Sequence, residues 1–247
     1  MGKKVKKMQF QQTLTRNYTF EGKGLHTGRT AKMTVCPAPV NTGVVFRRVD
    51  LGENACVEAL AENVSNTARS TTISKGEASV STIEHIMSAL TGMGVDNAMI
   101  EIDNIEVPIL DGSAKPYIDA IWKDGLEEQD APRKYIEIKE TIELTNEKGS
   151  IVRIEPAEEF SYDILVDFNS RVLGVQHGTW TADVDYTKEM EESLDKIAEG
   201  KTPWLDFMEI FYKNIQDIIG YTAHPNYNQK NYSPYFTTIG KLTDTRV

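Results

Sequence analysis

Two adjacent residues, Glu84 and His85, are the strongest candidates for chemistry in this sequence of 247 residues. A neutral imidazole binds zinc, and a nearby carboxylate can take a proton from the water that the metal activates. Neighbouring side chains on a helix point about 100° apart, so the two groups would approach one metal from different sides. An adjacent Glu and His also occur as an ordinary surface pair, so the assignment depends on the surrounding sequence.

Several short motifs accompany this pair along the chain. In sequence letters they are QTL at 12–14, GLHTG at 24–28, PAPVNTGVVFRRVDL at 37–51, STIEH at 81–85, GVDN at 94–97 and VPILDGSA at 107–114. In this order and spacing the motifs resemble the UDP-3-O-acyl-N-acetylglucosamine deacetylase family, the zinc amidohydrolases of lipid A synthesis. Residues 153–169 look like the opening of that family's second domain, so the resemblance covers about residues 8–170.

The resemblance implies a role for each member of the central pair. Glu84 matches the family's general base, and His85 matches its first zinc ligand. The implied reaction is zinc-assisted hydrolysis of the N-acetyl group of a UDP-linked, 3-O-acylated glucosamine, with release of acetate. Zinc lowers the pKa of its water toward ~7 and polarises the amide oxygen, while the carboxylate removes the water proton and returns it to the leaving amine.

The remaining zinc ligands are not found at the spacing that the resemblance implies. A catalytic zinc has three protein ligands and one open position. In the family, a His and an Asp four residues apart on a second-domain helix supply the other two. Neither His177 nor His224 has an aspartate four residues later. Asp217, on a predicted helix, has Lys213 one turn before it instead of a histidine.

Three interpretations of this departure stay open. In the first, the second domain is truncated or replaced, and the chain is a catalytically inactive descendant that serves as a binding or structural module. In the second, His177 or His224 completes the metal site from another scaffold position. The third ligand would then come from one of the following residues: Asp183, Asp185, Asp217. In the third interpretation, the divergent end of the chain has no selected function.

The elements that must position these residues indicate the α+β class. Strands are predicted where apolar runs are bounded by Gly, Pro or Asn, at 8–10, 18–20, 31–35, 44–49 and 97–102. Helical spacing predicts a helix at 80–92, with Ser81 or Thr82 as its N-cap and Gly92 at its end. A second helix is predicted at 115–123. His26, in the glycine loop, is assigned a structural role, and Asp111 is expected to cap a turn or the second helix.

A polar stretch at 127–133 is the predicted linker between two domains, residues 1–128 and residues 133–247. Further strands are predicted beyond it, at 135–138, 141–144, 151–154 and 162–168, followed by helical patterns at 186–197 and 204–219. The letters RIEPA at 153–157, followed by a β-rich run, repeat the pattern of TVCPA at 34–38. The expected architecture is therefore a tandem two-domain α/β sandwich. Its second domain is incomplete or divergent after about residue 170.

Composition limits the partners and the compartment. The net charge of −10 and the lack of a basic stripe with interleaved aromatics argue against a nucleic-acid binder. Two cysteines, Cys36 and Cys56, are too few for a disulfide framework and favour a reduced, cytoplasmic protein. No apolar run is long enough to span a bilayer, and no signal-like segment follows the N-terminal lysines. A peripheral contact with lipid stays open, and the sequence makes no prediction of oligomeric state.

Overall fold

The described part of the chain has a mixed α+β fold with several sheets and few helices, which confirms the predicted class. The computed structural model describes residues 9–145, 151–157, 161–167, 175–181, 185–188 and 242–243. The chain divides into two units, Met1–Tyr135 and Ile136–Val247. Each unit has its own sheets, and the motifs singled out above up to residue 114 belong to the first.

A five-stranded mixed sheet is the largest element of the first unit. Its strands, in spatial order, are β2 (Tyr18–Lys23), β3 (Thr30–Pro37), β9 (Ala98–Ile102), β4 (Val44–Arg48) and β5 (Cys56–Glu58). All neighbours are antiparallel except β4 and β9, which run parallel. Alternate residues are buried on one face because side chains alternate along a strand; examples are Met33, Val35, Ile100 and Ile102.

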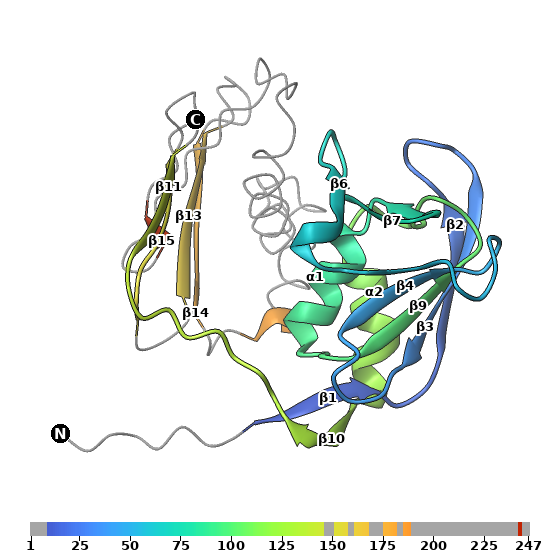
Figure 1. Ribbon diagram of the computed structural model, residues 1–247, viewed down its shortest axis with the longest axis horizontal. Helices are drawn as coiled ribbons and strands as arrows, with labels where there is room; N and C mark the ends of the chain where they lie inside the picture. Colours follow the sequence, from blue (N-terminus) through green and yellow to red (C-terminus); the bar gives the residue numbers. More distant parts are fainter. Residues whose placement is uncertain are drawn as a thin grey trace. The chain divides into compact units, whose positions relative to one another are not determined.

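Two helices, α1 (Glu84–Met93) and α2 (Lys115–Ile121), lie along this sheet (Figure 1). Ile86 and Leu90 are among the fully buried side chains of α1. The helix ends at Gly94, whose φ of 85° is left-handed and whose N–H bonds to the carbonyl of Leu90. The predicted end at Gly92 was therefore two residues early, because the glycine that adopts the left-handed conformation is Gly94. A short 3₁₀ turn, η2 (Trp122–Asp124), follows α2.

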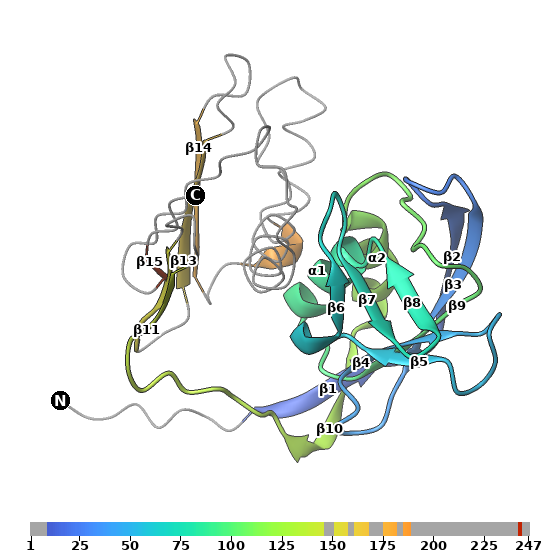
Figure 2. The same ribbon diagram turned by 45° about the horizontal axis from the view of Figure 1, so that its top comes forward.

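A three-stranded antiparallel sheet covers another side of the helices (Figure 2). Its strands are β6 (Val64–Asn66), β7 (Thr72–Lys75) and β8 (Ala78–Ser81), and the 3₁₀ turn η1 (Ala61–Asn63) precedes them. The helix predicted to start at residue 80 begins at Glu84 instead. The reason is that Val80 and Ser81 pair with Ile73 and Thr72 of β7, which keeps them in the strand.

The predicted linker is also a strand. β10 (Leu126–Pro132) pairs antiparallel with β1 (Phe10–Leu14), so residues 127–133 were wrongly predicted as linker. The side chains of this segment are polar and mostly exposed, although its backbone pairs with β1. A polar composition is typical of a linker, so the strand could not be recognised from the sequence. The strand predicted at 135–138 was wrong as well, because this segment has no strand partner among the described residues and Ile136 is 92% exposed.

The described residues of the second unit form two sheets. One comprises β11 (Ile142–Thr145), β12 (Ile151–Ile154) and β15 (Leu242–Thr243), all antiparallel. The other pairs β13 (Ser161–Asp167) with β14 (Val175–Thr181). The strands predicted at 141–144, 151–154 and 162–168 are confirmed. Residues 186–188 form a helical turn, while the helix predicted at 204–219 lies outside the described residues. In the described part of the chain, no helix is long and apolar enough to span a membrane.

Candidate functional site

A sharp turn between β8 and α1 places Glu84 and His85 at the first two positions of the helix. Ile83 precedes the helix, and its carbonyl accepts the N–H of Met87 at 3.0 Å. Thr82 has a φ of 59°, a left-handed conformation that is uncommon for a β-branched residue. The chain therefore passes from strand to helix within two residues, and this backbone conformation sets the direction in which the pair leaves the helix.

Neither residue predicted to cap the helix does so. The hydroxyl of Ser81 donates to the carbonyl of Ile105 at 3.3 Å. The hydroxyl of Thr82 donates to Oε1 of Glu106 at 3.0 Å. Because both hydroxyls bind the segment that follows β9, the helix starts without a side-chain cap, and the N-cap prediction was wrong.

The carboxylate of Glu84 is almost completely buried, with 6% of the residue exposed. Its Oε2 atom accepts the backbone N–H of Thr71 at 3.0 Å. The other carboxylate oxygen accepts no hydrogen bond from the residues that the structure describes. A negative charge in the first turn is favoured by the helix dipole. Glu84 is thus held in place through one oxygen while the other is available to accept a proton.

His85 is partly exposed, and its Nδ1 atom is buried. His85 follows Glu84 in α1, and neighbouring positions of a helix are about 100° apart around its axis. Over the described ranges, no three His, Cys, Asp or Glu side chains gather closely enough to hold a metal ion. The described residues therefore offer the imidazole of His85 as a metal donor without a complete ligand set around it.

The other residues considered as ligands belong to the second unit. His177 lies in β14, opposite Leu165 of β13. Asp185 is exposed, and its Oδ1 accepts the hydroxyl of Thr187 at 2.6 Å and the N–H of Lys188 at 3.3 Å. The hydrogen bond from Thr187 is the main cause that lowers the pKa of Asp185. Asp185 therefore caps the helical turn at 186–188. The remaining candidates lie outside the described residues: Asp183, Asp217 and His224.

A second buried carboxylate, which the sequence analysis missed, lies close to this turn. Glu106 is 1% exposed, and it accepts the N–H of His26 at 2.9 Å and the N–H of Thr27 at 2.7 Å. Burial raises the pKa of its carboxyl, but the hydrogen bonds from His26, Thr27 and Thr82 outweigh burial and hold the pKa below its ordinary value. The available sequence signal was a single carboxylate between two apolar neighbours, Ile105 and Val107.

The glycine loop also contacts the segment that orients Glu84. Nε2 of His26 lies 3.2 Å from the carbonyl oxygen of Arg69, a residue with a φ of 64°. Two residues later, Thr71 provides the N–H that binds Glu84. The hydroxyl of Thr71 is buried and has no hydrogen-bond partner among the described residues. These contacts support the structural role expected of His26.

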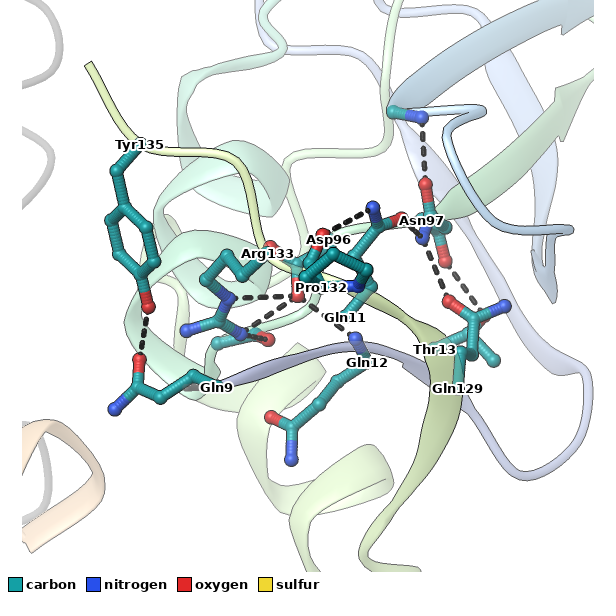
Figure 3. A network of polar contacts seen from close by, with 12 residues as sticks. Gln9, Gln11, Gln12, Thr13, Asp96, Asn97, Gln129, Pro132, Arg133 and Tyr135 are labelled. Atoms are coloured by element: carbon teal, nitrogen blue, oxygen red, sulfur yellow. Dashed lines mark hydrogen bonds and ion pairs between the residues drawn. The ribbon is translucent and has the colours of Figure 1, made fainter. Parts of the chain in front are cut away.

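The motif at 94–97 has a structural role at the opposite end of α1 (Figure 3). Oδ2 of Asp96 accepts two hydrogen bonds from Arg133, at 2.7 and 3.0 Å. The side chain of Asn97 donates to Gln11 at 2.8 Å and to Gln129 at 2.7 Å. This network joins β1 and β10 to the end of α1 and to the start of β9. Its polar groups are matched with one another, which identifies it as support for the fold.

Asp111 caps a turn, one of the two roles expected of it. Its Oδ1 accepts both the N–H and the hydroxyl of Ser113 at 2.9 Å. The helix α2 that follows has no side-chain cap. The motif at 107–114 therefore shapes the loop between β9 and α2.

Fold and site together define the class: an α+β protein that carries a buried carboxylate and a partly exposed imidazole at the start of one helix. The sequence profile of the LpxC family, described as UDP-3-O-acyl N-acetylglycosamine deacetylase, matches residues 11–202. The chain belongs to the UDP-3-O-acyl N-acetylglycosamine deacetylase family, which confirms the resemblance found in the motifs.

Individual relatives agree with this membership. The chain is 45% identical over 188 residues to the "bifunctional enzyme LpxC/FabZ" of Porphyromonas gingivalis, covering 76% of this chain and 40% of the relative. It is 51% identical over 147 residues to a UDP-3-O-acyl-N-acetylglucosamine deacetylase of Citrifermentans bemidjiense, covering 59% and 48%. It is 42% identical over 177 residues to the deacetylase of Thioalkalivibrio sulfidiphilus, covering 72% and 57%. The chain thus spans about half the length of the curated relatives it matches.

Proposed function

We propose that this chain is a zinc-dependent deacetylase. It would remove the N-acetyl group of UDP-3-O-acyl-N-acetylglucosamine and release acetate, a step of lipid A biosynthesis. The observation that carries the proposal is the pair at the start of α1, where Glu84 is buried and held by Thr71 while His85 stays partly exposed. Family membership and the names of the relatives support the choice of substrate.

The donor chemistry of the pair fits one side of a zinc site. A partly exposed imidazole is a common zinc ligand, and a catalytic zinc needs two further protein ligands. We propose that these come from residues 171–247, with His177, His224 and Asp217 as candidates. When bound, zinc would polarise the amide carbonyl and lower the pKa of water in the site.

Glu84 would act as the general base and then as the general acid. Its free carboxylate oxygen takes a proton from the attacking water while the water oxygen bonds to the acetyl carbon. The same proton passes to the nitrogen of the sugar as the carbon–nitrogen bond breaks, and acetate leaves. The N–H of Thr71 holds the carboxylate in place through both proton transfers, since it binds the opposite oxygen.

Acetate release from the full chain with UDP-3-O-acyl-N-acetylglucosamine tests this proposal. Glu84→Gln should reduce the rate by at least about 100-fold, the size of a lost general base. Its zinc content should stay that of the unsubstituted chain. Glu101→Gln is the matched control, because Glu101 lies in β9 and pairs with Arg47 on the sheet. Equal rates in the Glu84 and Glu101 variants would refute the assignment of the base.

A second candidate function is a non-catalytic binding or structural module. It is favoured by the single imidazole donor at the pair in the described part of the chain and by the partial coverage of the relatives. Zinc content separates the two proposals. Protein that stays metal-free after incubation with zinc and dialysis would favour the module, whereas stoichiometric zinc bound through His85 would favour the enzyme.

We propose that the chain acts in the cytoplasm. Both cysteines, Cys36 and Cys56, are free, which suits a reducing compartment and supports the cytoplasm as the site of action. We also propose that the second unit is an incomplete or divergent counterpart of the family's second domain. A peripheral contact with lipid would be detected by co-sedimentation of the chain with vesicles.

A further inference from the structure

Glu106 joins two segments that are distant in sequence. On one side it accepts the backbone N–H groups of His26 and Thr27, at 2.9 and 2.7 Å, from the glycine loop at 24–28. On the other it accepts the hydroxyl of Thr82 at 3.0 Å, from the turn between β8 and α1. A buried carboxylate that accepts several hydrogen bonds fixes the position of its donors. Each hydrogen bond to a charged group is strong, and its loss destabilises the fold.

The hydrogen bond between Glu106 and Thr82 affects the position of Glu84 and His85, because Thr82 lies in the turn just before them. The left-handed conformation of Thr82 costs free energy for a β-branched residue, and such a conformation persists only where its surroundings hold it. Glu84 follows Thr82 by two residues, at the first position of α1. A relaxed Thr82 would therefore change the angle at which the chain enters the helix, and with it the position of the Glu84 carboxylate.

The hydrogen bonds between Glu106 and the glycine loop affect the segment that holds the carboxylate of Glu84. The backbone N–H of His26 binds Glu106, and Nε2 of its ring lies 3.2 Å from the carbonyl oxygen of Arg69. Arg69 also has a left-handed φ, of 64°, and Thr71, two residues later, binds the Glu84 carboxylate. Both the backbone before Glu84 and the donor that holds its Oε2 atom are thus connected to the same buried carboxylate.

We infer that Glu106 is a positioning residue for Glu84: it fixes the strand-to-helix turn through Thr82 and the 69–71 segment through His26. The inference rests on the proposed function in one respect, the role of Glu84 as base. Glu106 itself does not act on the substrate, because it is buried behind the turn and all of its described contacts are with the protein.

The first experiment separates positioning from folding. In acetate release by the full chain, Glu106→Gln should lower kcat by about 100-fold, the cost of a misplacement of about 1 Å. KM, zinc content and the folded fraction should stay within about twofold, since Glu106 is buried and all of its described contacts are with the protein. Glu101→Gln serves as the charge-matched control and should retain full kcat. A kcat for Glu106→Gln that falls only in proportion to its folded fraction would overturn the inference.

A pair of milder variants tests the link through the hydroxyl of Thr82. Thr82→Val keeps the β-branched shape and removes the donor to Glu106, whereas Thr82→Ser keeps the donor. We expect kcat to fall at least about tenfold in the valine variant and to stay within about threefold in the serine variant. Equal kcat values in the two variants would overturn the inference even if Glu106→Gln failed to fold.

An amide-exchange experiment keeps the inference testable if the chain releases no acetate. In that case the proposed function fails, and hydrogen exchange at the Thr71 amide reports directly on the contact with Glu84. In Glu106→Gln the exchange rate of the Thr71 amide should rise at least about tenfold. The amide of Ile100, in β9, is the internal reference and should exchange at its usual rate. An unchanged rate at Thr71 would show that Glu106 does not position this contact.

Discussion

Replacement of Gly24 by alanine tests the packing of the Glu106 carboxylate most sharply. A methyl group at position 24 would lie 2.6 Å from Cδ of Glu106 and 2.7 Å from Oγ1 of Thr27, both too close for real carbon contacts. The carboxylate would have to move, because the backbone of Gly24 is fixed by a hydrogen bond of its N–H to the carbonyl of Arg29 at 2.9 Å. Its two backbone donors, from His26 and Thr27, would then be lost together.

The size of the effect follows from those two bonds. Each hydrogen bond to a charged group contributes about 1.5–3 kcal/mol, so the loss of both lowers the free energy of unfolding of the first unit by about 3–6 kcal/mol. Gly22→Ala is the matched control, because its methyl would lie 3.3 Å from Cβ of Pro108 and 3.5 Å from Leu110. A small adjustment relieves these contacts, and we expect a change below about 1 kcal/mol.

Hydrogen exchange at buried amides of β3 and β9 is the appropriate assay, since a two-unit chain need not unfold in one step. The slowest amides should exchange at least about 100-fold faster in Gly24→Ala than in Gly22→Ala, the equivalent of about 3 kcal/mol. Equal protection in the two variants would refute the packing of Glu106 against the glycine loop.

Three further predictions concern the same unit. Because its hydrogen bonds outweigh burial and hold the pKa of Glu106 below the unfolded value, its contribution to stability is present above the unfolded pKa and lost as pH falls through the folded pKa. Glu106→Gln should therefore flatten the acid limb of stability measured by urea unfolding, and an unchanged limb would contradict this. Thr71→Val should leave the free energy of unfolding unchanged or raise it by up to about 1 kcal/mol in urea titrations, because it removes a buried hydroxyl that has no partner among the described residues. Asp96→Asn should lower the same free energy by about 1–3 kcal/mol through its contact with Arg133, and a smaller loss is expected for the exposed Asp124→Asn. Equal losses in these two variants would speak against the network at the end of α1.

The sequence was a good guide where local pattern and burial coincide. The bounded apolar runs at 31–35 and at 97–102 predicted β3 and β9 to within two residues, because each strand has one buried face. The spacing of Ile83, Ile86 and Leu90 predicted α1 for the same reason, since these side chains line its buried side. In both cases the contacts with the core have the period of the secondary structure itself.

The local sequence pattern gave wrong or no predictions where contacts between distant segments decide the structure. Residues 127–133 are polar and were predicted as a linker, yet all but the last of them belong to β10, which pairs with β1 at the beginning of the chain. The short strands β6 and β7 contain Ser, Thr and Asn and show no clear alternation, so their pairing could not be read locally. The hydroxyls of Ser81 and Thr82 resembled helix caps, but a segment more than twenty residues later binds both.

The candidate site was predicted in part. Glu84 and His85 were found from their types and from the surrounding motifs, and the structure places both at the start of α1. Glu106 and Thr71 were missed because their contacts are long-range: Glu106 binds His26 across 80 positions, and Thr71 binds Glu84 across 13. No local pattern encodes such contacts. The further metal ligands, proposed from residues 171–247, stay a prediction.

The zinc content of three forms of the full chain tests the central claim most directly. Unsubstituted protein and the Glu84→Gln and His85→Ala variants would be incubated with zinc, dialysed and assayed for bound metal. The account predicts about one zinc per chain in the unsubstituted protein and in Glu84→Gln, and a loss of that zinc in His85→Ala. Full zinc retention by His85→Ala, or a chain that holds no zinc in any form, would contradict it.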